Sequence, residues 1–396
     1  MRFFVGLLFL GILVNNAMPA ATARTTAPDS TPFTIELGER HILHSDILGE
    51  DRQVLVRVPE SYDTEGNTSR YPVIYVLDGE RHFGHASLGA DILEETERMP
   101  ESIIVALPNN EGVRGRDLAR AQDNFRRFIG EELFAFIDNR YRTHQQKTLF
   151  GHSLAGYFTL SMLANHSDMF DNYIAASPAI NDDDVAKLDQ LLSNKSALPK
   201  SVFFTQASAV EEGPRRWAAV EKLAALFEAK APTSFTWRYD YTDDQIHMTT
   251  PFLTVYPGMS FVFSDYQAPN YINTKAFNDA GGMSAFSNFF ARRAAKYNVA
   301  DGIPQSALRN IASLYSNEDK HEQALMLFKE NVAKYPNRPR VYNSLGSGYE
   351  AAGKDDLALA AFEKAAKMAN EQNAPGWAKN WFQRNRDRLK EKLANQ

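Results

Sequence analysis

The sequence predicts an α/β protein with a mostly parallel central sheet, followed by a small all-helical region. From about residue 33 to residue 263, short β-rich runs alternate with amphipathic helical stretches, which is the pattern of a sheet covered by helices on both faces. Several of the β-rich runs are continuously apolar, as in parallel strands that are buried on both faces. After Pro304 the strand-like runs stop, and the rest of the chain is Ala-rich, Lys/Glu-rich and helical in pattern.

The first two strands are expected at an edge of this sheet. FTIEL (33–37) and RQVLVRV (52–58) alternate polar and apolar residues, as partly exposed strands do. The following strands are expected to be buried, with helices between them. The apolar runs are PVIYVL (72–77), SIIVAL (102–107), TLF (148–150), YIAAS (173–177) and SVFFTQA (201–207), with a further strand-like run at 235–241, and the helical stretches are 121–139, 154–165, 182–194 and 215–230.

The first 23 residues are predicted to be a signal peptide. Arg2 precedes an apolar run from Phe3 to Val14, and the segment Ala21-Thr22-Ala23 offers the small residues that signal peptidase reads. The apolar run is shorter than the roughly 20 residues that a membrane-spanning helix needs. We therefore expect export to the periplasm or the medium, with no membrane span after the signal is removed.

The composition is that of a soluble globular protein and excludes several kinds of site. The chain has 396 residues, of which 44% are apolar and 23% charged, and its net charge is −6. This acidic balance argues against nucleic-acid binding, which requires a basic surface. The chain contains no cysteine, so disulfides, thiolate nucleophiles and zinc–sulfur sites are excluded.

The helical tail contains an internal repeat with a period of 34 residues. The matching positions are Leu308, Ile311, Ala312, Tyr315, Ala324, Phe328 and Asn331, followed 34 residues later by Tyr342, Leu345, Gly346, Tyr349, Ala358, Phe362 and Ala365. This pattern resembles tetratricopeptide repeats, which implies a surface for a protein or peptide partner, or an added wall for an active site; an ordinary pair of helical hairpins is the alternative. The sequence therefore divides into an α/β domain (24–265), a connector (266–303) that contains a short aromatic helix, and helical repeats (304–396).

The strongest chemical signal is the segment TLFGHSLAGYFTL, in which Ser153 follows a buried strand and precedes a helix. This is the pattern of a nucleophile elbow, where a tight strand-to-helix turn exposes the serine hydroxyl and small flanking residues tolerate the strain. Gly151 fits the pattern, whereas Ala155 stands where the motif usually has glycine. The backbone N–H of Leu154, at the helix N-terminus, is expected to face a developing oxyanion. A structural turn serine is the alternative.

A serine nucleophile needs a base and an acid that orients it. His247 follows the last predicted strand, in TDDQIHMTTP, which fits the chain order Ser, acid, His. The acid is expected after the strand 201–207, where Glu211 and Glu212 stand. Glu212 is favoured because Gly213 behind it allows a tight turn, and Glu211 is the second choice.

Further residues are predicted to complete the site. A second oxyanion donor is expected near Gly79, at the end of the strand 72–77, because glycine permits a backbone angle that bulkier residues resist. The loop 109–120 follows another strand end, where open α/β sheets bind ligands. Its Arg114 and Arg116 are candidates to bind an anionic substrate group, with a salt-bridge network as the equal alternative. The other candidate substrate-binding residues are Glu80, His82 and His152.

Together these segments resemble a known family. YPVIYVLDGERHF, NNEGVRGRDL, FIGEELFAFIDNRYRT, GHSLAGYF, FDNYIAASPA and DDQIHM look like motifs of the α/β-hydrolase esterase family that includes esterase D-like enzymes and the enterobactin (siderophore) esterases. The resemblance covers about 33–263. It implies the α/β-hydrolase fold and hydrolysis of carboxylic esters by Ser153, His247 and Glu212 or Glu211, without a metal or cofactor. Ala155, the lack of a second glycine beside Gly79 and a slightly long acid loop depart from the family pattern.

The sequence therefore predicts an exported serine esterase that acts on a small-molecule ester through an acyl-enzyme intermediate. One alternative is acyl transfer to a sugar or lipid hydroxyl on the same fold. Another is a non-catalytic hydrolase-like scaffold that binds a partner through the helical repeats. Siderophore esters, short-chain acyl esters and sugar acyl esters all remain open as substrates.

Overall fold

The computed structural model describes residues 34–395. The predicted signal peptide (1–23) and Phe33, the first residue of a predicted strand, lie outside this range. Within residues 34–395, no helix has the length and apolar character that crossing a membrane requires.

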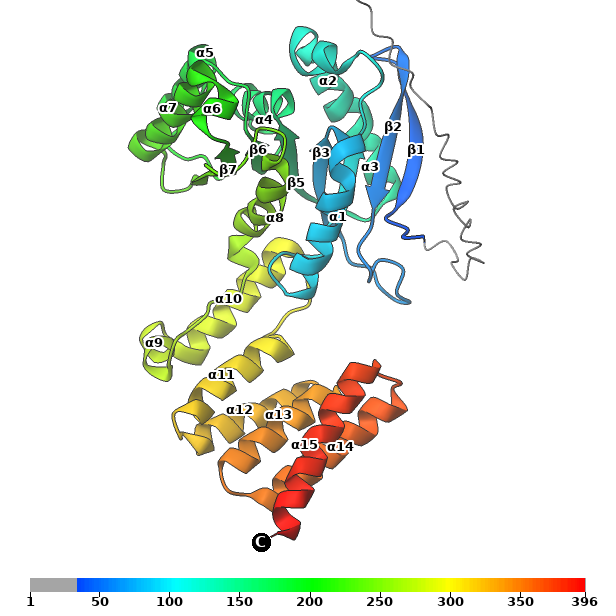
Figure 1. Ribbon diagram of the computed structural model, residues 1–396, viewed down its shortest axis with the longest axis vertical. Helices are drawn as coiled ribbons and strands as arrows, with labels where there is room; N and C mark the ends of the chain where they lie inside the picture. Colours follow the sequence, from blue (N-terminus) through cyan, green and yellow to red (C-terminus); the bar gives the residue numbers. More distant parts are fainter. Residues whose placement is uncertain (1–33, 396) are drawn as a thin grey trace, which may run out of the picture. The chain divides into compact units, whose positions relative to one another are not determined.

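An eight-stranded, mostly parallel sheet forms the centre of the α/β domain (Figure 1). The strand order is β1-β2-β4-β3-β5-β6-β7-β8. The pairs β1–β2 and β2–β4 are antiparallel, and all the other pairs are parallel. The strands are β1 (Glu39–Ser45), β2 (Glu50–Arg57), β3 (Tyr71–Leu77), β4 (Ile103–Leu107), β5 (Thr143–His152), β6 (Asn172–Ala176), β7 (Ser201–Gln206) and β8 (Thr236–Tyr241).

All of the predicted strands except the first are confirmed. The first strand was expected at 33–37, but residues 34–37 have no regular structure and β1 begins at Glu39. β1 pairs with β2 from Glu39–Val56 to Ser45–Glu50. To extend this pairing to residue 37, β1 would need a partner beyond Arg57, where β2 ends and a turn closes from Pro59 to Tyr62. Proline cannot donate a ladder hydrogen bond, so the hairpin stops there.

Helices cover both faces of the sheet, because the buried strands alternate their side chains between two apolar clusters. Val73, Tyr75 and Leu77 of β3 belong to one cluster, and Ile74 and Val76 belong to the other. On the first face lie α2 (Gln122–Arg127), the π-helical η2 (Phe128–Leu133), α3 (Phe134–Arg140), α4 (Leu154–Asn165), α5 (Asp182–Asn194) and α7 (Pro214–Lys230); on the second face lie α1 (Gly79–Glu95) and α8 (Thr250–Val262).

The predicted helices 121–139, 154–165, 182–194 and 215–230 are confirmed to within a residue or two. Helices α1 and α8 were not predicted: the segment after β3 was expected only to form an oxyanion loop, and no helix was assigned to the segment after His247. Short elements were also missed, among them the π-helical η1 (Arg116–Arg120) and α6 (Ala209–Glu212). The missed elements place residues of the candidate site, as described below.

The connector is itself helical and contributes to two apolar clusters. It contains the 3-10 turn η3 (Ser264–Tyr266), α9 (Thr274–Asp279) and α10 (Gly282–Tyr297). Tyr297, at the end of α10, packs in the cluster of α1 and α8. Phe286 and Phe290 of the same helix pack with the helices that follow. The domain boundaries at 265 and 303 stay a prediction.

The C-terminal region consists of antiparallel helical hairpins with a regular period. Its helices are α11 (Gln305–Asn317), α12 (His321–Lys334), α13 (Pro339–Ala351), α14 (Asp355–Glu371) and α15 (Gly376–Ala394). The first residues of α13 and α14 follow those of α11 and α12 by 34 residues each. A Cβ on Gly346 would lie 2.7 Å from the Phe362 ring, so the glycine lets the two helices of this hairpin approach. The tetratricopeptide identity of these hairpins stays a prediction.

Candidate active site

Ser153 lies on a strained turn between β5 and α4. Its backbone angles are φ 58° and ψ −113°, and the next residue, Leu154, begins α4. A positive φ is costly for a residue with a side chain, and such strain is concentrated at functional sites. The buried strand β5 therefore ends by presenting a half-buried serine at the N-terminus of a buried helix.

The residues around Ser153 explain both the expected glycine and the unexpected alanine. A Cβ on Gly151 would lie only 2.3 Å from the carbonyl oxygen of Ala155, so position 151 cannot carry a side chain without moving the turn. Ala155 is fully buried and packs in the apolar cluster of the first sheet face. Its methyl group therefore has room, and this departure from the motif leaves the strained turn intact.

His247 and Glu212 form a hydrogen-bonded pair. The distance between His247 Nδ1 and Glu212 Oε2 is 2.9 Å, and the side chains are 18% and 1% exposed. The other oxygen of Glu212 accepts a hydrogen bond from the Ala207 backbone N–H at 3.3 Å. Of the two predicted acids, the structure thus brings Glu212 to the histidine, while Glu211 on the same short helix α6 is exposed.

The surroundings of Glu212 keep its carboxylate ionised. Burial raises the pKa of Glu212, but hydrogen bonds from His247 and from the Ser177 hydroxyl lower it, and the net pKa lies below its ordinary value. Ser177 directly follows β6, is buried and has a positive φ of 40°. Ser177 was not among the predicted site residues, although a polar residue at the carboxyl end of a buried parallel strand is the signal that could have found it.

His152 joins the Ser153 turn to the loop of His247. The Nε2 atom of His152 lies 2.9 Å from the backbone carbonyl oxygen of His247, and the two imidazole rings are 4.8 Å apart. Burial, together with the nearby His247, lowers the pKa of His152 to about 4. Among residues 34–395, no hydrogen bond links Ser153 Oγ to the His247 imidazole. The loop contact through His152 is what places the two candidate residues in one region.

The candidate second oxyanion donor lies at the N-terminus of α1. Gly79 is the first residue of this helix, and Asp78 precedes it in the left-handed conformation with φ 53°. The reason for glycine is not the one predicted: Gly79 does not have a positive φ. Instead, a Cβ at position 79 would lie 2.8 Å from the backbone of Leu107 and Pro108, at the end of β4. Close approach between chain segments therefore requires this glycine.

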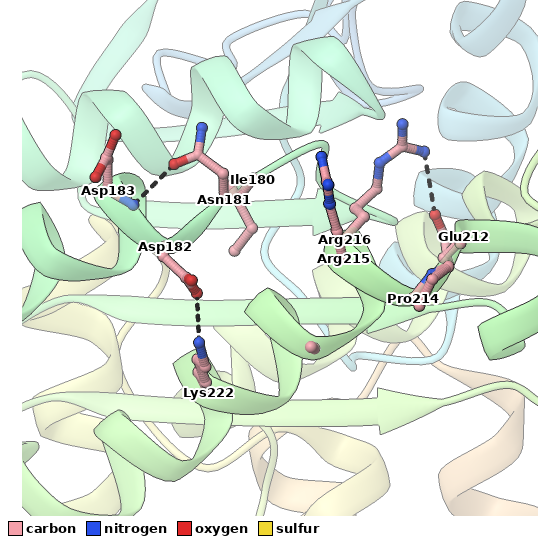
Figure 2. A pocket seen from close by; sticks show the side chains of 11 residues that line it. Ile180, Asn181, Asp182, Asp183, Glu212, Pro214, Arg215, Arg216 and Lys222 are labelled. Carbon is pink, nitrogen blue, oxygen red and sulfur yellow. Dashed lines mark hydrogen bonds and ion pairs between the residues drawn. The ribbon is translucent and has the colours of Figure 1, made fainter.

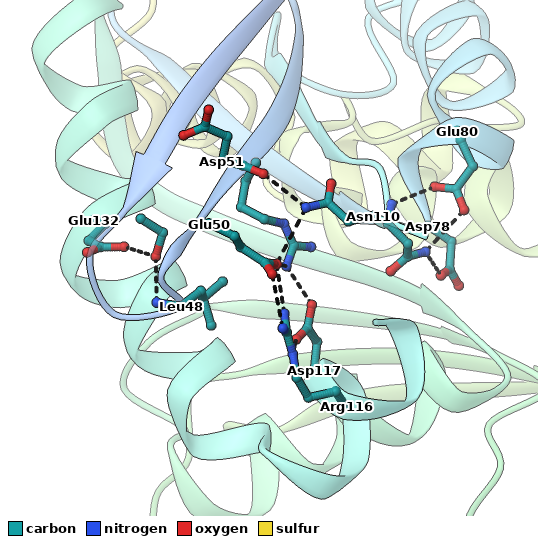
Figure 3. A network of polar contacts seen from close by, with 12 residues as sticks. Leu48, Glu50, Asp51, Asp78, Glu80, Asn110, Arg116, Asp117 and Glu132 are labelled. Atoms are coloured by element: carbon teal, nitrogen blue, oxygen red, sulfur yellow. Dashed lines mark hydrogen bonds and ion pairs between the residues drawn. The ribbon is translucent and has the colours of Figure 1, made fainter. Parts of the chain in front are cut away.

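The two arginines of the loop 109–120 are paired with carboxylates of the protein. Arg114 donates to both carboxylate oxygens of Asp78, at 2.6 and 2.7 Å. Arg116 donates to Glu50 and to Asp117, which also accepts from the buried Arg52 (Figure 3). These contacts correspond to the predicted salt-bridge network. A role for either arginine in substrate binding stays a prediction.

The other predicted substrate-binding residues have protein partners as well. Glu80 is exposed and accepts hydrogen bonds from the backbone and side chain of Asn109 (Figure 3). His82 is buried, and its Nδ1 lies 2.9 Å from Nε2 of His85. Burial is the main cause that lowers the pKa of His82 to about 3, and the neighbouring His85 is the second.

Within residues 34–395, no cluster of three or more His, Cys, Asp or Glu side chains is arranged to hold a metal ion.

A cavity of about 870 Å³ is lined in part by Glu212, whereas His247 and Ser153 are not among its lining residues. One wall is formed by Glu212 and the start of α7, including Arg215 and Arg216 (Figure 2). The opposite wall is the segment from Ile180 to Asp183, at the start of α5. Arg216 Nη1 lies 3.4 Å from Glu212 Oε2. The volume is sufficient for a small organic molecule.

Comparisons with known proteins agree with this architecture. Residues 45–249 match the family model described as "Putative esterase". The ferri-bacillibactin esterase BesA of Bacillus subtilis is 30% identical over 190 residues, which are 40% of this chain and 64% of that protein. The chain therefore spans less than two thirds of the length of this relative.

Solved structures show the same fold at low sequence identity. An IroE-like serine hydrolase from Shewanella oneidensis has a TM-score of 0.58 at 20% identity, over 74% of this chain and 98% of that one. An uncharacterised protein from Capnocytophaga ochracea has a TM-score of 0.60 at 17% identity, over 89% of this chain and 99% of that one. Because the family model covers more than half of the sequence, this chain belongs to the esterase family of that model.

Proposed function

We propose that this protein hydrolyses carboxylic esters with Ser153 as nucleophile, His247 as general base and Glu212 as the acid that orients the histidine. The observation that carries the proposal is a strained serine at a strand-to-helix turn, next to a loop whose half-buried histidine is hydrogen-bonded to a buried carboxylate of α6. Membership of the esterase family supports the same reaction.

The proposed reaction follows the chemistry of serine hydrolases. Ser153 Oγ attacks the ester carbonyl while His247 Nε2 takes the hydroxyl proton, and the Glu212 carboxylate stabilises the imidazolium that forms. The backbone N–H of Leu154 and a donor near Gly79, both at helix N-termini, stabilise the oxyanion. His247 then protonates the leaving alcohol. Water, activated by the same histidine, releases the acid from the acyl-enzyme.

The substrate we propose to test first is an iron-siderophore ester. This choice is supported by the activity for which BesA, the Bacillus subtilis relative, is named. Simple short-chain acyl esters are the comparison substrates.

We also propose that the protein is exported after cleavage behind Ala23. N-terminal sequencing of the mature protein should then begin at Arg24.

The test of the proposed reaction is the Ser153→Ala variant. We expect this variant to lose p-nitrophenyl acetate turnover by several orders of magnitude, on the order of 10³-fold or more, with unchanged circular dichroism. A fluorophosphonate probe should label Ser153 in the wild type and leave the variant unlabelled. Turnover by the variant equal to that of the wild type would exclude Ser153 as the nucleophile.

A further inference from the structure

We infer that His152, the residue before Ser153, is a positioning residue that fixes the loop of the general base and the loop of the oxyanion donor to the nucleophile turn. The inference rests on the proposed function and goes beyond it, because His152 was predicted from sequence only as a substrate contact. It follows from hydrogen bonds at both the side chain and the backbone of this one residue.

The side chain of His152 anchors the base. Its Nε2 lies 2.9 Å from the carbonyl oxygen of His247, so Nε2 must carry a proton that it donates. Thr250 Oγ1 donates to the same carbonyl oxygen at 3.0 Å. The backbone of His247 is therefore fixed from two sides, while its side chain is fixed through Glu212. Since His152 and Ser153 are adjacent, the His152 bond sets the distance between nucleophile and base.

The backbone of His152 anchors the oxyanion loop. Its carbonyl oxygen accepts a hydrogen bond from Arg114 Nη2 at 3.2 Å. The same guanidinium binds both carboxylate oxygens of Asp78, directly before Gly79. Arg114 thus links the candidate oxyanion donor to the nucleophile turn. Arg114 makes these contacts although its side chain is 37% exposed.

The surroundings of His152 suit a permanent hydrogen-bond donor and do not suit a group that exchanges protons. The ring is buried, and it packs against the His82 ring in a T-shaped arrangement at a centroid distance of 5.9 Å. Asp78, Arg114, His82 and His247 are the charged or titratable groups that face it. With its pKa lowered to about 4, His152 stays neutral at neutral pH.

The experiment compares His152→Gln with His152→Phe, with p-nitrophenyl acetate as the substrate. Glutamine places an N–H donor near the position of Nε2, whereas phenylalanine fills the space without donating. We expect His152→Phe to lower kcat about 100-fold with KM changed less than about twofold, because misplacing a catalytic group by about 1 Å has effects of this size. His152→Gln should recover kcat to within about tenfold of the wild type. His144→Gln, at the start of the same strand, serves as the control and should behave as the wild type.

Three results would overturn the inference. One is equal kcat for His152→Gln and His152→Phe. Another is a change in KM alone, which would indicate substrate contact. The third applies if His152→Phe does not fold: nitrogen-15 NMR of the wild type then decides, because a His152 protonated only on Nδ1 would contradict the inferred bond.

The inference and the proposed function can fail separately. Wild-type activity in the His152 variants together with an inactive Ser153→Ala variant would refute only this inference. No turnover and no fluorophosphonate labelling of the wild type would refute the proposed function itself.

Discussion

At the scale of single residues, two neighbouring glutamates have different environments. Glu212 is buried and bonded to His247, while Glu211 is exposed. Both glutamates lie on the four-residue helix α6. The Ser208 side chain caps this helix by accepting a hydrogen bond from the Glu211 backbone N–H, and the cap fixes which of the two glutamates points inward. The ionised state of Glu212 then depends on hydrogen bonds from His247 and Ser177 that outweigh burial.

This difference yields a matched pair of variants. Glu212→Gln keeps the size of the side chain and removes its charge, so the imidazolium loses its stabilising partner. We expect kcat to fall on the order of 10³–10⁴-fold, as for acids in comparable triads. Glu211→Gln should stay within about twofold of the wild type. Steady-state kinetics on p-nitrophenyl acetate measures both, and a larger loss in Glu211→Gln would reverse the assignment of the acid.

At the scale of elements, the N-terminus of α1 is held against the end of β4. Gly79 makes this approach feasible, and Asp78 is bonded by Arg114 and by Asn109. Glycine is therefore required at position 79 by packing between two elements. A second glycine of the same helix, Gly84, has more room, because among residues 34–395 a Cβ there would meet only the Leu37 side chain, at an ordinary contact distance of 3.9 Å.

The two glycines predict opposite changes in stability. Gly79→Ala should lower the free energy of unfolding by about 1–3 kcal/mol, because backbone must shift to admit the methyl group. Gly84→Ala should raise it by up to about 1 kcal/mol through helix propensity. Urea unfolding followed by circular dichroism gives both values. If Gly79→Ala is as stable as the wild type, the contact of α1 with β4 is looser than the structure shows.

At the scale of the whole molecule, buried neutral histidines couple stability to pH. Burial lowers the pKa of His82 to about 3 and the pKa values of His85 and His152 to about 4. The ordinary value is 6.5, so between about pH 6.5 and pH 4 the unfolded chain binds protons that the folded chain does not. In this range the contribution of these three histidines to the free energy of unfolding falls as the pH falls. Glu94 acts in the opposite direction, because burial raises its pKa to about 7.

We expect the three histidines to outweigh Glu94, so that the protein loses stability steadily from about pH 6.5 to pH 4. Urea midpoints at constant ionic strength measure the trend. In the His85→Gln variant, one of the three groups no longer titrates, so the decline should be shallower. A midpoint that rises on acidification would contradict this expectation, because it would mean that Glu94 outweighs the three histidines.

The sequence by itself determined the α/β class, seven of the eight strands, the helices 121–139, 154–165, 182–194 and 215–230, and the strained position of Ser153. These features follow from local patterns: continuous apolar runs, helical periodicity and small residues around a serine. The 34-residue period of the C-terminal hairpins could be predicted for the same reason.

Only the tertiary structure decided where β1 begins, which glutamate meets His247, and which partners Arg114 and Arg116 take. The start of β1 depends on where its partner strand ends. Glu212 and His247 are 35 residues apart, and Arg116 and Glu50 are 66 apart. A buried charge is stable only where a partner of opposite charge lies beside it. Because that partner comes from a distant segment, it depends on the path of the whole chain and cannot be predicted from a local sequence pattern.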